Sequence, residues 1–144
     1  MEEARKQFLI HLQYLSDRRT GLFFHGFTFE NDGNFANALW ARGNSWITIA
    51  IPEYLELLDL PSDDRQHLVE MYVSQVEALA HYQNKESGMW HTLIDDPTSY
   101  VESSATAGFA LGILKGIRLK LISRQKYQAV ALKARHGLSS QIDD

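Results

Sequence analysis

A short motif occurs twice in this chain, and each copy opens the same succession of segments. Thr20–His25 reads TGLFFH and Ser87–His91 reads SGMWH, with their glycines 67 residues apart (88 minus 21). Each motif lies in a long loop that is followed by a largely apolar helical segment and then by a more amphipathic one. Such repeated units are typical of a toroid of helical hairpins. A simple up-and-down bundle would not need loops of about twenty residues.

Helical periodicity accounts for the rest of the chain. Apolar positions recur at helical spacing, and no segment shows the alternation of a half-buried strand. Ser62 is expected to cap the third helix, and Gly137 to end the fifth. We therefore predict an all-α fold with about five helices, over residues 2–18, 44–58, 62–83, 102–118 and 124–136.

Composition excludes several classes of partner. The formal net charge of -4 argues against nucleic acid, because no basic stripe is present to neutralise phosphates. No segment approaches the ~20 apolar residues of a membrane span, so no membrane partner is expected. The chain has no cysteine, which excludes disulfides and thiolate nucleophiles, and a cytoplasmic location is the default expectation.

Motifs for metals, nucleotides and nucleophilic catalysis do not occur. The six histidines are scattered, without HExxH or a dense acid cluster, so we expect no metal site. Without GxGxxG or a P-loop motif no nucleotide cofactor is expected, and without GxSxG no serine nucleophile is assigned. Asp95 and Asp96 precede Pro97, a pattern typical of a turn rather than of paired catalytic carboxylates.

The segment Thr20–Trp46 gathers aromatic, histidine and arginine side chains between glycines. Its aromatics either plug into the core beneath the loop or line a cleft. Trp40 and Trp90 offer flat faces that stack on sugar rings, and Arg42 can bind a carboxylate through two hydrogen bonds. Trp46 lies four residues after Arg42, on the same face of a helix that begins there. This combination suits an acidic sugar.

Glu102 is open to two interpretations. It precedes a buried helix and lies next to Tyr100, Ser103 and Ser104. Either it is a negative charge favoured at the start of a helix, or it is a polar group of the same site.

Three stretches carry a resemblance to a known family. They read HLQYLSDRRTGLFFHGF, WARGNSW and GMWHTLIDDPTSYVESSATAGFALGILKGI. They are similar to the unsaturated rhamnogalacturonyl hydrolases of glycoside hydrolase family 105, which are related to the unsaturated glucuronyl hydrolases. The resemblance covers nearly the whole chain and implies a partial (α/α)6 toroid, in a single incomplete domain spanning residues 1–144.

The resemblance also implies a reaction and a set of residues. The family's substrates are pectin-derived oligosaccharides that end in 4,5-unsaturated galacturonic acid. An Asp protonates C4 of the vinyl ether, water adds at C5, and the hemiketal collapses to release the sugar. That Asp belongs to a stretch N-terminal to the ones matched here, so we expect this chain to lack it and assign no catalytic residue. The implied substrate-binding residues are His25, Arg42 and Trp46, with weaker motif matches at Trp40, Trp90 and Glu102.

Three functions remain open from the sequence. The chain is a glycan hydrolase, or an inactive remnant that at most binds uronate sugars, or a structural protein. An acidic oligosaccharide is the expected partner in the first two cases. An open half-toroid would expose apolar inner helices, so a homo-oligomer that covers them is the expectation in the third.

Overall fold

The computed structural model describes residues 2–34 and 36–142. These residues form the helices α1 (Glu2–Leu15), α2 (Ala41–Leu57), α3 (Ser62–Tyr82), α4 (Ser103–Arg118) and α5 (Arg124–Ser139). The all-α prediction is confirmed, with one departure: the short strands β1 (Trp90–His91) and β2 (Val101–Glu102) form an antiparallel pair. None of the helices in this described part of the chain is long and apolar enough to cross a membrane.

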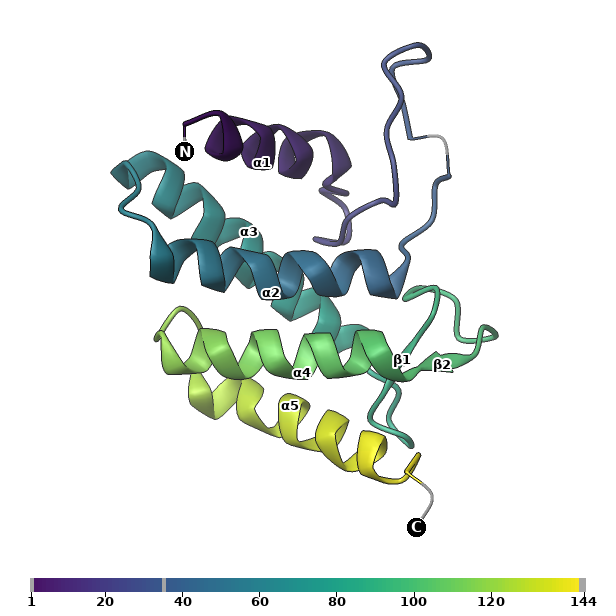
Figure 1. Ribbon diagram of the computed structural model, residues 1–144. Coiled ribbons are helices and arrows are strands. Elements are labelled where there is room, and N and C mark those ends of the chain that lie inside the picture. The colour runs from purple at the N-terminus through teal and green to yellow at the C-terminus, as the bar shows by residue number, and fades with distance from the viewer. Residues whose placement is uncertain (1, 35, 143–144) are drawn as a thin grey trace.

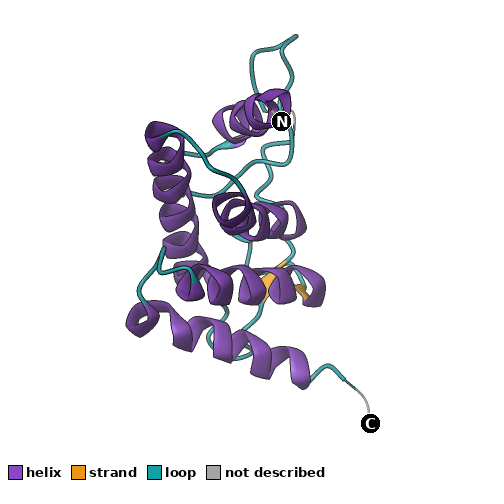
Figure 2. Cartoon of the chain, turned by 60° about the vertical axis from the view of Figure 1, so that its left-hand side comes forward, coloured by secondary structure: helices purple, strands orange, loops and turns teal. Residues whose placement is uncertain are grey.

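Helix α4 is central to the arrangement. It packs against α2 on one side and against α5 on the other, and α3 packs against α2. Helices α2 and α4 lie side by side with their N-terminal ends at the same end of the molecule, next to β1 and β2 (Figure 1). Figure 2 shows α5 along the edge of the molecule that leads to the C-terminus. The long loops therefore gather at the N-terminal ends of α2 and α4.

Small residues allow α4 to approach α2 closely. A Cβ atom on Gly108 would lie 2.9 Å from the Cβ of Ser45, and one on Gly112 would overlap the backbone of Thr48. Real Cβ atoms do not approach neighbours this closely, because protein interiors are packed at the density of crystals. The glycines of α4 thus bring two helix backbones together.

Tyr72 ties α3 to α4. Its side chain is fully buried on α3, and its hydroxyl donates a hydrogen bond of 2.8 Å to the carbonyl of Gly112. Burial raises the pKa of this hydroxyl well above its usual range, so Tyr72 remains a donor. The bond satisfies a polar group that would otherwise be costly in the core.

The repeat predicted from the sequence is present in the structure. Gly21 and Gly88 both adopt left-handed φ angles, of +81° and +72°. Each glycine packs against the second helix of its own repeat unit. A Cβ on Gly21 would lie 2.5 Å from Oγ of Ser74 in α3, and a Cβ on Gly88 would lie 2.6 Å from the carbonyl oxygen of Lys133 in α5. Glycine is needed at both positions for conformation and for space.

Several helix ends differ from the prediction. Helix α1 ends at Leu15 rather than at residue 18, and α2 begins at Ala41 rather than at residue 44. Ser62 is the first residue of α3 rather than its cap, and its hydroxyl donates to the carboxylate of Asp63. Helix α5 continues through Gly137 to Ser139. A Cβ on Gly137 would overlap the carbonyl oxygen of Ser87. This glycine therefore marks a close contact between helix and loop, not a helix end.

Candidate functional site

The two long loops are joined by backbone hydrogen bonds where α2 begins. The N–H of Ala41 donates to the carbonyl of Thr92 at 2.9 Å, and the N–H of Ile94 donates to the carbonyl of Leu39 at 3.0 Å. The segments before α2 and before α4 thus form one continuous surface, and this surface carries most of the predicted site residues.

Two of the predicted side chains contact a third, Trp40. The guanidinium carbon of Arg42 lies 5.2 Å from the centroid of the Trp40 ring. The His25 ring meets Trp40 edge to face, with centroids 4.7 Å apart and an interplanar angle of 82°. Gly43 leaves room for this cluster, because a Cβ there would lie 3.3 Å from the Trp40 ring and 3.9 Å from Nδ1 of His25. Arg42 and His25 are exposed, and Trp40 is half-buried.

Arg42 and Trp46 lie one turn apart on α2, which begins at Ala41. Their predicted placement on one helical face is confirmed, and the Trp46 side chain is 67% exposed. Among the residues that the structure describes, no carboxylate forms an ion pair with Arg42. Its guanidinium donors are therefore available to a ligand.

Glu102 is a negative charge at the start of a helix, the first of the two interpretations open from the sequence. Its carboxylate caps α4: one oxygen accepts from the N–H and hydroxyl of Ser104 at 3.3 and 2.6 Å, and the other accepts from the N–H of Ala105 at 2.5 Å. Burial alone would raise the pKa of Glu102, but these hydrogen bonds and the charge of Arg42 outweigh it and lower the pKa below its usual value. Glu102 thus positions α4 and places a negative charge near Arg42.

The expectation for Trp90 requires correction. Its side chain is 0% exposed, and its ring packs edge to face against Phe109 with centroids 5.1 Å apart. The indole N–H donates to the carbonyl of Leu79 at 2.8 Å. Trp90 therefore belongs to the core beneath the loop and presents no face on which a sugar could stack.

Asn44 was not predicted from the sequence and holds the first loop in place. It is 1% exposed on α2, and its amide contacts both backbone groups of Phe23. Oδ1 accepts from the Phe23 N–H at 2.8 Å, and Nδ2 donates to the Phe23 carbonyl at 2.8 Å. Because Phe23 is two residues before His25, this clamp sets where the imidazole lies. The sequence signal is a lone amide in a largely apolar helical segment.

Thr106 holds the equivalent point of the second repeat. Its hydroxyl accepts from the backbone N–H of Trp90 at 3.2 Å and donates to the backbone carbonyl of Glu102 at 2.7 Å. Phe23 and Trp90 each come two residues after the glycine of their motif. In both units a buried polar side chain of the helix that follows the loop, α2 or α4, therefore fixes the loop.

The arrangement suits recognition of a planar anion. A guanidinium lies over an indole face, and an imidazole packs nearly perpendicular to the same ring. Arginine binds carboxylates with fixed bidentate geometry, and aromatic faces provide apolar contact to a ring. Within residues 2–34 and 36–142, no group of three or more His, Asp or Glu side chains is arranged to hold a metal ion.

Comparison with known proteins identifies relatives of this chain. Residues 1–144 match the family model described as Glycosyl Hydrolase Family 88. Among curated proteins, the unsaturated rhamnogalacturonyl hydrolase YesR of Bacillus subtilis is 32% identical over 133 residues, which cover 92% of this chain. The same alignment covers 38% of YesR, so the chain spans well under half the length of this relative.

Solved structures agree with this assignment. A possible member of the GH105 family from Salmonella enterica superposes with a TM-score of 0.94 at 56% identity, covering 99% of this chain and 38% of that one. A second possible GH105 member, from Klebsiella pneumoniae, gives a TM-score of 0.93 at 53% identity, covering 99% of this chain and 37% of that one. The resemblance read from the sequence and the partial α/α toroid that it implied are both confirmed.

Proposed function

Because the chain belongs to Glycosyl Hydrolase Family 88, we propose that it binds the 4,5-unsaturated galacturonyl end of pectin-derived oligosaccharides. The observation that carries the proposal is the Arg42 guanidinium over Trp40, with no ion-pair partner among the described residues. An unsaturated uronate is flattened by its double bond and carries a carboxylate on the same ring. It therefore matches a cation that lies over an aromatic face.

Each side chain takes a distinct part in this proposal. Arg42 binds the carboxylate through two parallel hydrogen bonds, and the exposed ring of Trp46 stacks one turn further along α2. His25, whose ring packs nearly perpendicular to that of Trp40, donates to a sugar hydroxyl. Glu102 contributes only indirectly, because its carboxylate oxygens already accept hydrogen bonds at the start of α4.

The proposed reaction is hydration of the vinyl ether. A proton is added at C4, the oxygen of water bonds to C5, and the resulting hemiketal collapses with release of the attached sugar. In this proposal the residues named above orient the uronate, and none of them transfers the proton to C4. The name of the YesR relative supports the substrate class. The alternative is a protein that binds the uronate without turning it over.

One experiment separates these possibilities. The protein is incubated with an unsaturated rhamnogalacturonan disaccharide, and binding is measured by calorimetry while turnover is followed as loss of the double-bond absorbance. Saturable binding that Arg42→Ala weakens strongly and Arg42→Lys weakens less supports the proposal, because lysine keeps the charge but cannot form the bidentate pair. Arg135→Ala, an exposed arginine on α5, is the matched control and should bind normally.

The two readouts have different meanings. Turnover together with binding supports the hydrolase, and binding without turnover supports the non-catalytic alternative. If the folded protein does not bind the disaccharide, or binds its saturated counterpart equally well, the proposal is wrong.

A further inference from the structure

A second buried amide, on α3, contacts the start of α2. Gln75 is 0% exposed, and its Nε2 donates a hydrogen bond of 3.0 Å to the backbone carbonyl of Asn44. The same Nε2 lies 3.5 Å from Oδ1 of Asn44, which is the atom that accepts from the Phe23 N–H. Gln75 therefore reaches the loop that carries His25 through the side chain of Asn44.

The stability of the core does not explain this amide. Oε1 of Gln75 is buried and has no hydrogen-bond partner among the described residues, which is costly for a polar atom. The Asn44 carbonyl does not depend on Gln75, because it also accepts from the Thr48 hydroxyl at 3.0 Å. An apolar side chain of the same length would fill the space without burying an unpartnered oxygen. We therefore expect the amide to contribute little to the free energy of unfolding.

The amide of Gln75 instead determines how the Asn44 side chain is oriented. The oxygen and nitrogen ends of a side-chain amide have nearly the same shape, so hydrogen bonds decide which way round it lies. In the observed orientation Oδ1 faces Nε2 of Gln75 and the Phe23 N–H, and Nδ2 donates to the Phe23 carbonyl. The reverse orientation would bring the N–H donors of both amides together. Gln75 thus favours the orientation in which Asn44 binds the loop.

Within the described residues, the second repeat unit shows no counterpart of Gln75. There Thr106 of α4 holds the loop. None of the buried residues of α5 carries an amide: they are Tyr127, Ala131, Ala134 and Gly137. The side chains proposed to contact the uronate, His25, Arg42 and Trp46, all belong to the first unit. The additional amide therefore occurs in the unit that carries the ligand contacts.

Gln75 also supports the helical turn that carries Arg42. Asn44 lies two residues after Arg42 and two before Trp46 in α2. The hydrogen bond to the Asn44 carbonyl therefore holds this turn of α2 against α3. Support of this kind matters for binding, because a contact group displaced by about 1 Å loses much of its effect.

We propose that Gln75 is a positioning residue for the uronate site. Its amide fixes the orientation of Asn44, and thereby the placement of His25 and of the turn that carries Arg42. Gln75 itself does not touch the ligand. The identity of the ligand rests on the proposed function, whereas the placement of the loop does not.

The first test is Gln75→Met, which keeps the length of the side chain and removes the amide. We expect the Tm to stay at the wild-type value or rise. Binding of the unsaturated rhamnogalacturonan disaccharide should weaken by about three- to tenfold, comparable to the loss of one hydrogen bond. Gln75→Leu is a second apolar variant that should give both results.

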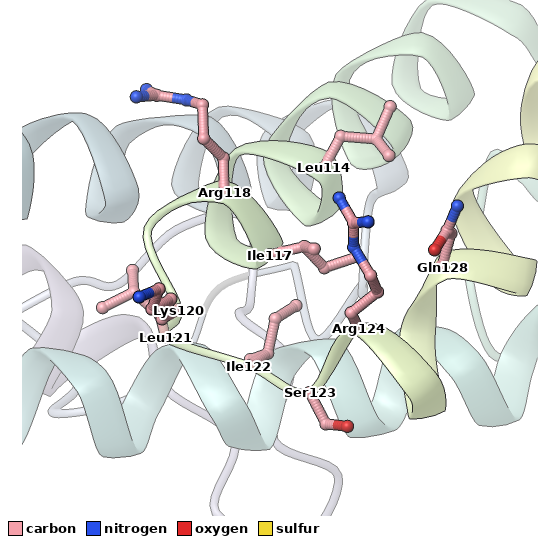
Figure 3. Close-up of a pocket in the computed structure, with 9 residues that line it drawn as sticks. All are labelled: Leu114, Ile117, Arg118, Lys120, Leu121, Ile122, Ser123, Arg124 and Gln128. Atoms are coloured by element: carbon pink, nitrogen blue, oxygen red, sulfur yellow. The ribbon is translucent and has the colours of Figure 1, made fainter.

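Gln128→Met is the matched control. Gln128 lines a cleft of about 670 Å³ between α4 and the start of α5, at the opposite end of α4 from the loops (Figure 3). This variant should bind the disaccharide as the wild type does. Wild-type affinity in Gln75→Met overturns the proposal. A Tm that falls in Gln75→Met makes Gln75 a packing residue and overturns it too.

A second readout does not depend on the ligand. NMR of the free protein reports the hydrogen exchange of the Phe23 amide and the chemical shifts of the His25 ring, which packs against Trp40. In Gln75→Met the Phe23 amide should exchange faster and the His25 signals should shift, while Gln128→Met changes neither. Unchanged signals overturn the positioning role even where the disaccharide binds. Shifted signals in a protein that does not bind the disaccharide support that role and refute the proposed function.

Discussion

Replacing Asn44 by alanine should release the first loop while the helices stay folded. Asn44 is buried on α2, and among the described residues its amide is the one hydrogen-bond partner of both the N–H and the carbonyl of Phe23. A third bond, from Nδ2 to the carbonyl of Trp40 at 3.0 Å, matters less because that carbonyl also accepts from the Asn44 backbone N–H. Asn44→Ala therefore leaves two backbone groups of Phe23 without partners.

The size of the effect follows from those two groups. Each buried polar group without a partner costs about 1–3 kcal/mol. The better helix propensity of alanine returns roughly 0.5 kcal/mol, so the free energy of unfolding should fall by about 1.5–5.5 kcal/mol. For a chain of this length, at about 3 °C per kcal/mol, that is a decrease in Tm of roughly 5–16 °C.

Two measurements check this prediction. Urea denaturation followed by circular dichroism gives the stability change, and amide hydrogen exchange by NMR reports on Phe23 itself. The Phe23 amide should lose its protection in Asn44→Ala, while amides in the middle of α4 keep theirs. Asn31→Ala, at an exposed asparagine, is the control and should change stability by less than about 0.5 kcal/mol. A loss in Asn44→Ala as small as in the control, or a Phe23 amide that stays protected, refutes the reasoning.

Three further predictions concern packing and charge. Gly112→Ala should lower the free energy of unfolding by more than about 2 kcal/mol, because its Cβ would overlap the α2 backbone. Gly33→Ala is the control and should be tolerated, because the nearest atom to its Cβ would lie 3.6 Å away. Thermal melts compare the two variants. Trp90→Ala should lower the free energy of unfolding by about 3–5 kcal/mol, because it removes a core side chain. Trp46→Ala should leave stability nearly unchanged and weaken uronate binding, because Trp46 is exposed. A Trp46 variant that binds the uronate normally would exclude Trp46 from the site. Glu102→Gln should lower stability at pH 7 by roughly 0.5–1 kcal/mol, through loss of a charged cap. The pKa of Glu102 is lowered in the folded state, so its contribution is complete above the unfolded pKa and is lost as pH falls through the folded pKa. The free energies of unfolding of the wild-type protein and of Glu102→Gln, measured by urea titration, should therefore become equal at acidic pH. A difference in stability that persists there would contradict the assigned role.

The fold was largely predictable because its determinants are local. Apolar spacing identified five helices. The paired motifs identified the repeat, since Gly21 and Gly88 both adopt the left-handed backbone conformation in their units. The spacing of Arg42 and Trp46 placed both on one face because a helix turn is fixed by geometry. Those inferences needed no knowledge of which segments pack together.

The corrections at Trp90 and Gly137, and the unpredicted role of Asn44, depend on partners that are distant in the sequence. Trp90 is buried because a carbonyl of α3 and the ring of Phe109 surround it. Asn44 is a clamp because a loop 21 residues earlier presents its backbone to it. Gly137 is a contact point because the second loop passes beside α5. Residue type and spacing alone do not carry this information.

The unequal capping of α2 and α4 has an electrostatic consequence. Each helix begins with a partial positive charge of roughly half an elementary charge, from aligned peptide dipoles, and the two beginnings lie at the same end of the molecule (Figure 1). At α4 the Glu102 carboxylate compensates this charge, whereas Trp40 supplies no side-chain cap to α2. The field at this end therefore favours an anion near the start of α2 even without the Arg42 side chain. Preference for negative ligands is thus shared between the backbone and the guanidinium, and part of it should persist when Arg42 is removed.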